Sequence, residues 1–248
     1  MLQDLAGQVA WITGAGTGIG AAGAIKLAEA GCKVVLSGRR VEPLEEVEAR
    51  IQEVGGESVL EPLDVSSQPD VAAVVDRIHA RFGRLDIGVF SAGINIKERN
   101  WPDVSIDGWD QVIGIDLDGA FYCCHAVLPI MRDQGGGLII NISSMAAKGI
   151  SALTGPAYIS SKHAMNAMTA SLLLEERNNG IRATAICPGE VATPILDHRP
   201  VPVSDEDQAR ILQSDELGDL ILFVAQQPPS VTLNEVLITP TYNRFAAS

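Results

Sequence analysis

Short runs of β-branched and aliphatic residues alternate with longer amphipathic segments along the whole chain, and this alternation constrains the fold most strongly. Runs with the length and composition of strands cover residues 9–13, 33–37, 58–63, 87–91, 138–142, 183–187 and 236–239. Helical spacing of apolar residues occupies residues 18–30, 42–54, 69–82, 107–132, 157–177 and 217–225. Such alternation favours an α/β fold, with one parallel sheet and helices on both faces. Because the last strand ends at residue 239, we expect a single domain over residues 1–248.

The chain is strongly acidic, and its charge narrows the range of partners. It has 31 Asp and Glu residues against 18 Lys and Arg residues, which gives a formal charge of −13. Such a surface repels phosphate backbones and anionic membranes, so we expect no nucleic acid and no membrane as a partner. Any anionic ligand must then be held by a local arrangement of amides and cations. No run approaches the roughly 18 apolar residues of a membrane-spanning helix, and residues 1–4 lack a basic leader, so we expect a cytoplasmic protein.

The cysteines and histidines lack the spacing of a metal site or a disulfide framework. Cys32, Cys123, Cys124 and Cys187 include no Cys-x-x-Cys pair, and most of them lie in apolar stretches. The four histidines are scattered along the chain. We therefore predict reduced core cysteines and no bound metal.

A glycine-rich segment, Thr13-Gly14-Ala15-Gly16-Thr17-Gly18-Ile19-Gly20, lies between the first strand and the first helix. Glycines at this place permit a tight turn and allow backbone N–H groups to approach a pyrophosphate, which the helix N-terminus also favours. The alternative is a plain strand–helix connection. The position directly after an N-terminal strand favours a dinucleotide site.

The end of the second strand indicates which dinucleotide is preferred. Folds that prefer NAD place an acidic residue there, about 20 residues after the glycine turn, to bind the ribose 2′-OH. This chain reads Val34-Val35-Leu36-Ser37-Gly38-Arg39-Arg40, with no acid before Glu42. A guanidinium suits a 2′-phosphate. We predict NADP(H), with NAD less favoured, Arg39 as the main contact and Ser37 or Arg40 assisting; alternatively, both arginines are only solvated.

Tyr158 and Lys162 are four residues apart in a predicted helix, so their side chains emerge on one face. A lysine ammonium about 5 Å from a phenolate stabilises it by about 3 kcal/mol at an effective dielectric near 20. Upstream, Ser143 and Ser144 end the strand 138–142, at the edge where doubly wound sheets bind ligands. Either serine can face this pair, depending on how the strand end is rotated.

Together these motifs resemble the short-chain dehydrogenase/reductase family over nearly the whole chain. The matches are Thr13-Gly14-x-x-x-Gly18-x-Gly20, Leu63-Asp64-Val65, Ser91-Ala92-Gly93, Asn141-Ile142-Ser143-Ser144, Tyr158-x-x-x-Lys162 and Pro188-Gly189-x-Val191-x-Thr193. The resemblance implies a seven-stranded doubly wound (Rossmann) sheet, a homodimer or homotetramer, and NAD(P)-dependent interconversion of a small-molecule carbonyl and its alcohol.

The resemblance also implies roles for individual residues. Tyr158 becomes the catalytic acid/base, Ser144 the group that holds the substrate oxygen, and Lys162 a ligand of the nicotinamide ribose. Asp64 binds the adenine. The remaining cofactor groove is formed by Gly14, Thr17, Gly18, Ile19, Gly20, Val65, Ala92, Gly93, Val191 and Thr193.

Two positions depart from the family pattern. Asp116 stands where the family has a catalytic asparagine, whose main-chain carbonyl positions a water that leads to the lysine. We keep Asp116 in the proton relay, because aspartate offers the same carbonyl, although a buried carboxylate beside Lys162 also stabilises the ammonium. Phe90-Ser91 replaces the usual Asn-Asn before Ala92-Gly93.

The substrate end is the least specified part of the sequence. Residues 194–214 break the strand–helix rhythm after a strand end, so they are a candidate lid, or alternatively a surface excursion without function. Ala146, Ile150, Leu153, Glu190 and Ile195 are expected to shape the pocket. Their apolar character favours a hydrophobic or small carbonyl, with Glu190 as a candidate selector of a polar or cationic group.

We therefore predict an NADP(H)-dependent oxidoreductase that interconverts a ketone or aldehyde and its alcohol. The alternative is a regulatory or scaffold protein that binds the nucleotide with little or no turnover. The helical segments 107–132 and 157–177 carry more apolar residues than one sheet-facing stripe needs, which favours a homo-oligomer.

Overall fold

A computed structural model describes residues 2–242 and contains one seven-stranded sheet in the order β3-β2-β1-β4-β5-β6-β9. All neighbouring strands pair in parallel. Their bounds are β1 (Val9–Thr13), β2 (Lys33–Ser37), β3 (Glu57–Leu60), β4 (Ile87–Phe90), β5 (Gly137–Ile142), β6 (Ile181–Pro188) and β9 (Glu235–Ile238). The strand order reverses between β1 and β4, which is the switch point where such sheets open a ligand crevice. The predicted doubly wound sheet is therefore confirmed.

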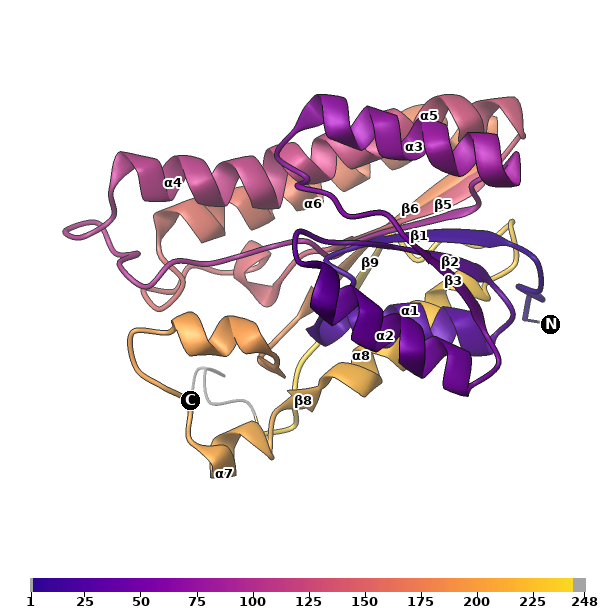
Figure 1. The fold of residues 1–248 in the computed structure, drawn as a ribbon. Coiled ribbons are helices and arrows are strands. Elements are labelled where there is room, and N and C mark those ends of the chain that lie inside the picture. The colour runs from indigo at the N-terminus through magenta and orange to yellow at the C-terminus, as the bar shows by residue number, and fades with distance from the viewer. Residues whose placement is uncertain (1, 243–248) are drawn as a thin grey trace.

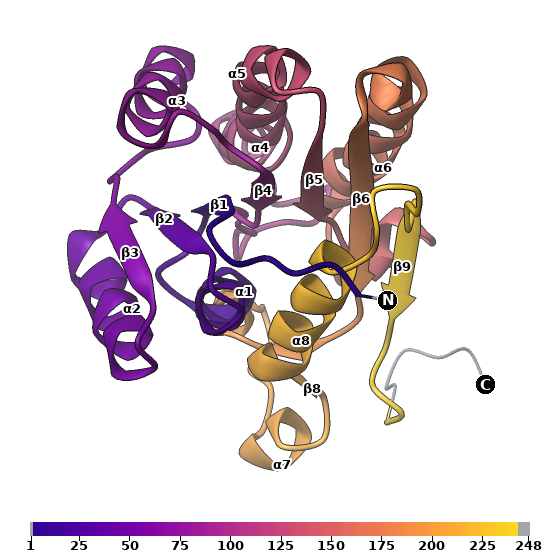
Figure 2. The same cartoon turned by 90° about the vertical axis from the view of Figure 1, so that its right-hand side faces the viewer.

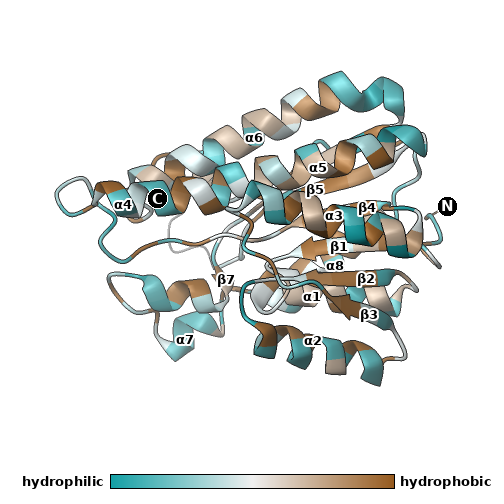
Figure 3. Ribbon diagram, turned by 45° about the horizontal axis from the view of Figure 1, so that its top comes forward, coloured by the Kyte–Doolittle hydropathy of each residue, from teal (hydrophilic) through white to brown (hydrophobic). Residues whose placement is uncertain are grey.

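Helices cover both faces of the sheet, as Figures 1 and 2 show. One face carries α1 (Gly18–Glu29), α2 (Val41–Glu53) and α8 (Ser214–Ala225); the other carries α3 (Gln68–Phe82), α5 (Gly119–Asp133) and α6 (Pro156–Glu176). Ile12 packs in the first layer and its neighbour Trp11 in the second, as strand alternation requires. In Figure 3 the strands are mostly brown between helices whose outer faces are teal. The core thus forms two apolar layers that hold the sheet edge rigid.

The predicted long helix over residues 107–132 is not continuous. It consists of α4 (Ile106–Ile113), a π turn (Gly114–Asp118) and α5. A π turn adds a residue to the helical repeat and is frequently found at functional sites. By length and composition the run Ile106–Asp133 also suffices to cross a membrane, a test that core helices of soluble proteins pass too. Here Cys123, Val127 and Met131 are buried in the second apolar layer.

Residues 194–214 leave the sheet at its carboxyl edge, where Figure 1 shows them projecting away from the other elements. They contain a 3₁₀ helix (Pro194–His198), the short α7 (Asp205–Gln208) and β8 (Leu212–Gln213), which pairs with β7 (Val191–Ala192). Leu196, Val203 and Ile211 form a small apolar cluster of their own. We call this segment the excursion. Its local order comes from this cluster and from the β7–β8 pair, neither of which the sequence pattern indicated.

Candidate active site

A cleft of about 670 Å³ opens at the carboxyl edge of the sheet, next to the excursion. We call it the main cleft. Residues from the glycine turn, the ends of β2, β4, β5 and β6, and helix α6 line it. The lining includes most of the predicted site residues: Gly14, Thr17, Gly18, Ile19, Arg39, Arg40, Gly93, Ser144, Tyr158, Lys162, Val191 and Thr193. The fold therefore brings together segments that are far apart in the sequence.

The glycine turn requires its glycines for two reasons. Gly14 and Gly18 have φ angles of +67° and +57°, which L side chains rarely adopt. A Cβ on Gly14 would lie 2.7 Å from the Ala92 nitrogen, and one on Gly18 would lie 3.0 Å from Thr193 Cγ2. Gly20 does not line the main cleft. It closes the turn onto α1, because a side chain there would collide with the Gly14 carbonyl.

Helix α1 begins at this turn, and its first residues line the main cleft. Thr17 occupies the N-cap position but its side chain makes no capping hydrogen bond. The first N–H groups of the helix therefore keep their hydrogen-bonding capacity, and the helix dipole adds positive potential. This cradle fits an anionic diphosphate.

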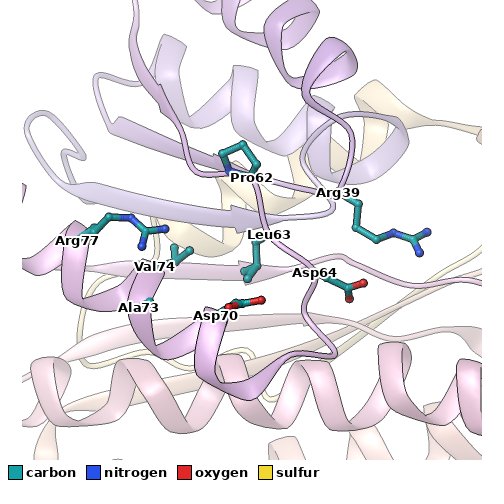
Figure 4. Close-up of a pocket in the computed structure, with 8 residues that line it drawn as sticks. All are labelled: Arg39, Pro62, Leu63, Asp64, Asp70, Ala73, Val74 and Arg77. Carbon is teal, nitrogen blue, oxygen red and sulfur yellow. The ribbon is translucent and has the colours of Figure 1, made fainter.

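A second, smaller pocket of about 440 Å³ adjoins the main cleft beyond the ends of β2 and β3. Figure 4 shows its lining: Arg39, Pro62, Leu63, Asp64, Asp70, Ala73, Val74 and Arg77. Arg39 lines both cavities, so it stands where they meet. The Asp64 carboxylate accepts hydrogen bonds from the Ser66 backbone at 3.0 Å and hydroxyl at 2.7 Å. Partial burial alone would raise the pKa of Asp64, but the Ser66 hydrogen bonds and the Arg39 charge outweigh it and lower this pKa.

Three predicted cofactor residues have other contacts. Ser37 is fully buried: its hydroxyl accepts from Trp11 Nε1 at 2.9 Å and donates to the Glu61 carbonyl at 2.7 Å. The expectation that Ser37 assists a 2′-phosphate is wrong, because this side chain lies in the core. Val65 is also buried, its side chain packs where Gly119 of α5 leaves room, and it lines neither cavity. The Ala92 amide donates to Thr13 Oγ1 at 3.4 Å.

Tyr158 and Lys162 lie one turn apart on α6 and both line the main cleft. Lys162 is only 3% exposed, and its Nζ lies 5.4 Å from the centroid of the Tyr158 ring. The ammonium donates to the Ile142 carbonyl at 3.2 Å and lies 3.5 Å from Asp116 Oδ2. These contacts hold the positive charge beside the tyrosine at the end of β5.

Asp116 lies at the centre of the π turn and is completely buried behind Lys162. Its Oδ1 accepts from the Ile94 amide at 2.8 Å. Burial raises the pKa of Asp116 above its ordinary value, although the Lys162 charge and the Ile94 amide act in the opposite direction. A Cβ on Gly93 would lie 3.5 Å from Lys162 Nζ and 3.6 Å from both Asp116 oxygens, which are ordinary contact distances, so Gly93 lies directly against this ion pair.

The two serines at the end of β5 have different roles. The Ser143 hydroxyl turns toward α6 and donates to the Lys162 carbonyl at 3.4 Å. Ser144 Oγ accepts from the Ala146 amide at 3.1 Å, which leaves its hydroxyl proton available to a ligand. Both residues line the main cleft, and this geometry favours Ser144 as the donor to a substrate oxygen.

Three charged residues occupy the substrate end of the main cleft. Arg99, in the loop after β4, is 5% exposed, and its Nη2 donates to the His198 carbonyl of the excursion. Arg199 forms an ion pair with Glu190 at 2.5 Å. The Glu190 carboxylate thus has a cationic partner within the chain, and its expected role as a selector of a polar or cationic group stays a prediction.

The sequence pattern singles out neither Arg99 nor Arg199. Arg99 follows Lys97 and Glu98 in a polar loop. No sequence motif connects this loop to His198 of the excursion, which lies far along the chain. The one available indication was its place after the end of a central strand, where ligands bind in such sheets.

The described part of the chain has no metal-binding geometry. No group of three or more His, Cys, Asp or Glu side chains is placed there to hold a metal ion. All four cysteines are buried, which confirms that they are core residues.

The family model for short chain dehydrogenases matches residues 8–201 of this sequence. The chain belongs to the short-chain dehydrogenase/reductase family. An uncharacterized oxidoreductase of Staphylococcus saprophyticus is 34% identical over 241 residues, covering 96% of this chain and all of the relative. The cyclohexanol dehydrogenase of an Acinetobacter species is 31% identical over 239 residues, covering 95% of this chain and 94% of the relative.

Solved structures agree with this assignment. A metagenomic short-chain oxidoreductase crystallised in complex with NADP superposes with a TM-score of 0.84 at 33% identity, covering 97% of this chain and all of that one. This short-chain dehydrogenase/reductase is accordingly an oxidoreductase that acts on CH–OH donors and their carbonyl counterparts. The cradle at the start of α1 and the smaller pocket beyond it fit the NAD or NADP that the family uses.

Proposed function

We propose that this enzyme is an NADP(H)-dependent reductase of a ketone or aldehyde, or in reverse a dehydrogenase of the corresponding alcohol. The observation that carries the proposal is the placement of Tyr158, Lys162 and Ser144 around one end of the main cleft. A phenol, a fixed ammonium and a free hydroxyl are the groups that a carbonyl oxygen needs as it gains charge and then a proton.

Each residue has a defined role in this scheme. Tyr158 donates its phenolic proton to the carbonyl oxygen during reduction and takes it back during oxidation. Ser144 donates a hydrogen bond to the same oxygen while negative charge develops on it. Lys162 stabilises the phenolate that Tyr158 leaves behind and is oriented by the Ile142 carbonyl. A bound nicotinamide supplies or accepts the hydride.

Asp116 helps to keep Lys162 in its charged form in this proposal. Lys162 stays protonated throughout, and the phenolate of Tyr158 regains its proton from solvent in the main cleft, which both residues line. Asp116 faces the ammonium and stabilises its charged form. Asp116 thus acts through Lys162 as a positioning residue.

The central test is the substitution Tyr158→Phe, which removes only the phenolic oxygen. We expect kcat to fall by at least about 100-fold, since a general acid contributes about 10²–10⁴-fold. The Kd for NADPH, measured by fluorescence titration, should change by less than about threefold. Tyr122→Phe is the matched control. Turnover that survives in Tyr158→Phe rejects the proposed mechanism, and NADPH binding without consumption of any carbonyl favours the regulatory alternative.

The preference for NADP is proposed from Arg39 and Arg40. Both are exposed at the end of β2, and Arg39 stands where the two cavities meet, next to Asp64 (Figure 4). A guanidinium at this place can bind the 2′-phosphate of NADP with charge-assisted hydrogen bonds, and it does not repel the uncharged adenosine. The NADP complex of a relative supports the same preference.

Substitution of Arg39 by alanine tests this preference. We expect the ratio of kcat/KM for NADPH to that for NADH to fall by about 10- to 100-fold, because a charge-assisted hydrogen bond contributes about 1.5–3 kcal/mol. Arg50→Ala, an exposed arginine on α2, serves as the control. An unchanged ratio in Arg39→Ala excludes Arg39 as the selecting residue.

Several expectations from the sequence stay predictions. These are the single-domain organisation, a lid function for the excursion, a homodimer or homotetramer, and a cytoplasmic location. The position of the excursion beside the main cleft supports the lid, since Pro194, Ile195, Leu196, His198 and Arg199 contribute to the lining.

A further inference from the structure

The substrate end of the main cleft holds a buried arginine without a carboxylate partner among the described residues. Arg99 is 5% exposed, and none of the ion pairs in the described part of the chain includes it. Its Nη2 donates to the His198 carbonyl, while its Nε has no hydrogen-bond partner in residues 2–242. A buried guanidinium N–H without an acceptor destabilises the protein, so a partner for it is expected in the functional complex.

The surroundings of Arg99 strengthen this expectation. Its pKa is lowered, first by burial and then by the nearby positive charge of Arg199, while Tyr158 acts in the opposite direction. Arg99 is therefore close enough to Arg199 and to Tyr158 to interact with both.

A charge count identifies the kind of ligand that fits. Arg99 and Arg199 contribute two positive charges, and Glu190, paired with Arg199, contributes one negative charge. Lys162 is balanced by Asp116, and Arg39 and Arg40 lie at the cofactor end. Among residues 2–242, the Arg99 charge is therefore the one at the substrate end without a carboxylate counterpart, in a protein whose total charge is −13.

We propose that the substrate carries a carboxylate and that Arg99 binds it, so the enzyme reduces an oxo acid or oxidises the matching hydroxy acid. A carboxylate has the single charge that the count requires and the planar geometry that a guanidinium binds in two places. This inference rests on the proposed function for its chemistry. The reaction is oxo acid plus NADPH plus a proton to hydroxy acid plus NADP⁺, with hydride added to the carbonyl carbon and the Tyr158 proton to its oxygen.

The unmodified enzyme provides the first test. NADPH consumption is measured with 2-oxobutanoate, 3-oxobutanoate and 4-oxopentanoate, each against its methyl ester. The carbonyl position varies in this series, so the carboxylate can reach Arg99 in one member. We expect kcat/KM for at least one acid to exceed that of its ester by about 10- to 100-fold. Esters that match or exceed their acids throughout the series overturn the proposal.

Substitutions then assign the preference to Arg99. Arg99→Gln should abolish the acid-to-ester ratio, while Arg99→Lys should restore part of it because it keeps the charge without the planar fork. Arg50→Gln is the control. Thermal melting and NADPH titration establish that each variant is folded. A purely structural role, in which Arg99 only ties its loop to His198, predicts that the variants lower both rates equally and leave the ratio unchanged.

A binding measurement separates this inference from the proposed function. Calorimetry with the NADP⁺ complex compares pentanoate with pentanamide, neither of which can react. Binding of pentanoate that Arg99→Gln abolishes supports the carboxylate site even where no carbonyl is turned over. Reduction of neutral ketones by an enzyme that binds pentanoate no better than pentanamide leaves the proposed function standing and rejects the carboxylate site.

Discussion

At the scale of single residues, the proposed mechanism makes Asp116 a control on how strongly Lys162 acts on Tyr158. Its carboxylate lies 3.5 Å from the ammonium and so offsets part of the positive potential at the phenol. An asparagine at this position keeps the acceptor for the Ile94 amide but removes the negative charge. Substitution of Asp116 by asparagine therefore separates its two contributions, the hydrogen bond that holds the Ile94 amide and the negative charge that balances Lys162.

We predict that Asp116→Asn shifts the acidic limb of the pH–rate profile for alcohol oxidation to lower pH by about one unit. The sign follows from charge: without the carboxylate, the ammonium stabilises the phenolate more, so less alkaline conditions suffice to form it. The profile of kcat between pH 5 and 10 measures the shift. Asp118→Asn, on the same π turn, is the control. A shift to higher pH, or none, contradicts the prediction.

The sequence predicted those site residues whose neighbours are close along the chain. Tyr158 and Lys162 share a helix turn, so short-range rules place them together, whereas Ser143 and Ser144 both stayed open until the family resemblance favoured Ser144. Arg99 was missed because its contact with His198 depends on how distant loops pack. Ser37 was misplaced although strand alternation puts it on the same face as Val35, which packs in the layer of Trp11.

At the scale of elements, the strand bounds followed from composition, whereas the interruption of the long helix did not. The bounds of β1 and β2 match the predicted residues 9–13 and 33–37. The π turn between α4 and α5 was missed, although the residue that it inserts rotates the following apolar pattern by about 100° around the helix. The β7–β8 pair was also missed, since each strand has only two residues.

The contact between α5 and α6 depends on an ion pair whose strength should vary with pH. Arg132 donates to the Glu176 carboxylate through Nε at 2.9 Å and through Nη2, and Asn179 adds a hydrogen bond at 2.8 Å. The Arg132 hydrogen bonds, opposed by desolvation, lower the pKa of Glu176 from 4.5 to about 2. The stabilisation is therefore complete above about pH 4.5 and is lost as the pH falls toward 2.

We predict that Glu176→Gln lowers the free energy of unfolding by about 1–2 kcal/mol at pH 7, a value reduced because Arg132 is half exposed. The difference from the unmodified protein should shrink steadily below pH 4.5. Urea unfolding at fixed protein concentration between pH 7 and 3 measures it. Glu175→Gln, an exposed neighbour that bonds only Ser171 among the described residues, should have less than half the effect. A difference that is constant with pH refutes the role of the ion pair.

At the scale of the whole molecule, charge and apolar surface are unevenly distributed. The protein carries a charge of −13, yet both ends of the main cleft present arginines, Arg39 and Arg40 at one end and Arg99 and Arg199 at the other. An acidic surface around a cationic cleft directs anions to the cleft and away from the rest of the molecule. This arrangement is consistent with the two proposed ligands, a dinucleotide at one end of the main cleft and an oxo acid at the other, because both are anions.

Large apolar side chains remain exposed on the helices that the sequence predicts as a subunit interface. Ile106 is 77% exposed on α4, Phe121 49% on α5 and Leu174 64% on α6.

We predict that the protein is a homo-oligomer, with a mass in light scattering that is a multiple of 26.2 kDa, and that Phe121→Glu lowers this mass. A buried carboxylate at a symmetric interface lies close to its own copy, so association weakens by several kcal/mol, about 100-fold or more in Kd. Val54→Glu, which is 46% exposed at the end of α2, is the matched control and should leave the mass unchanged. A monomeric parent protein, or a Phe121→Glu variant that keeps the parent mass, rules out an interface through α5.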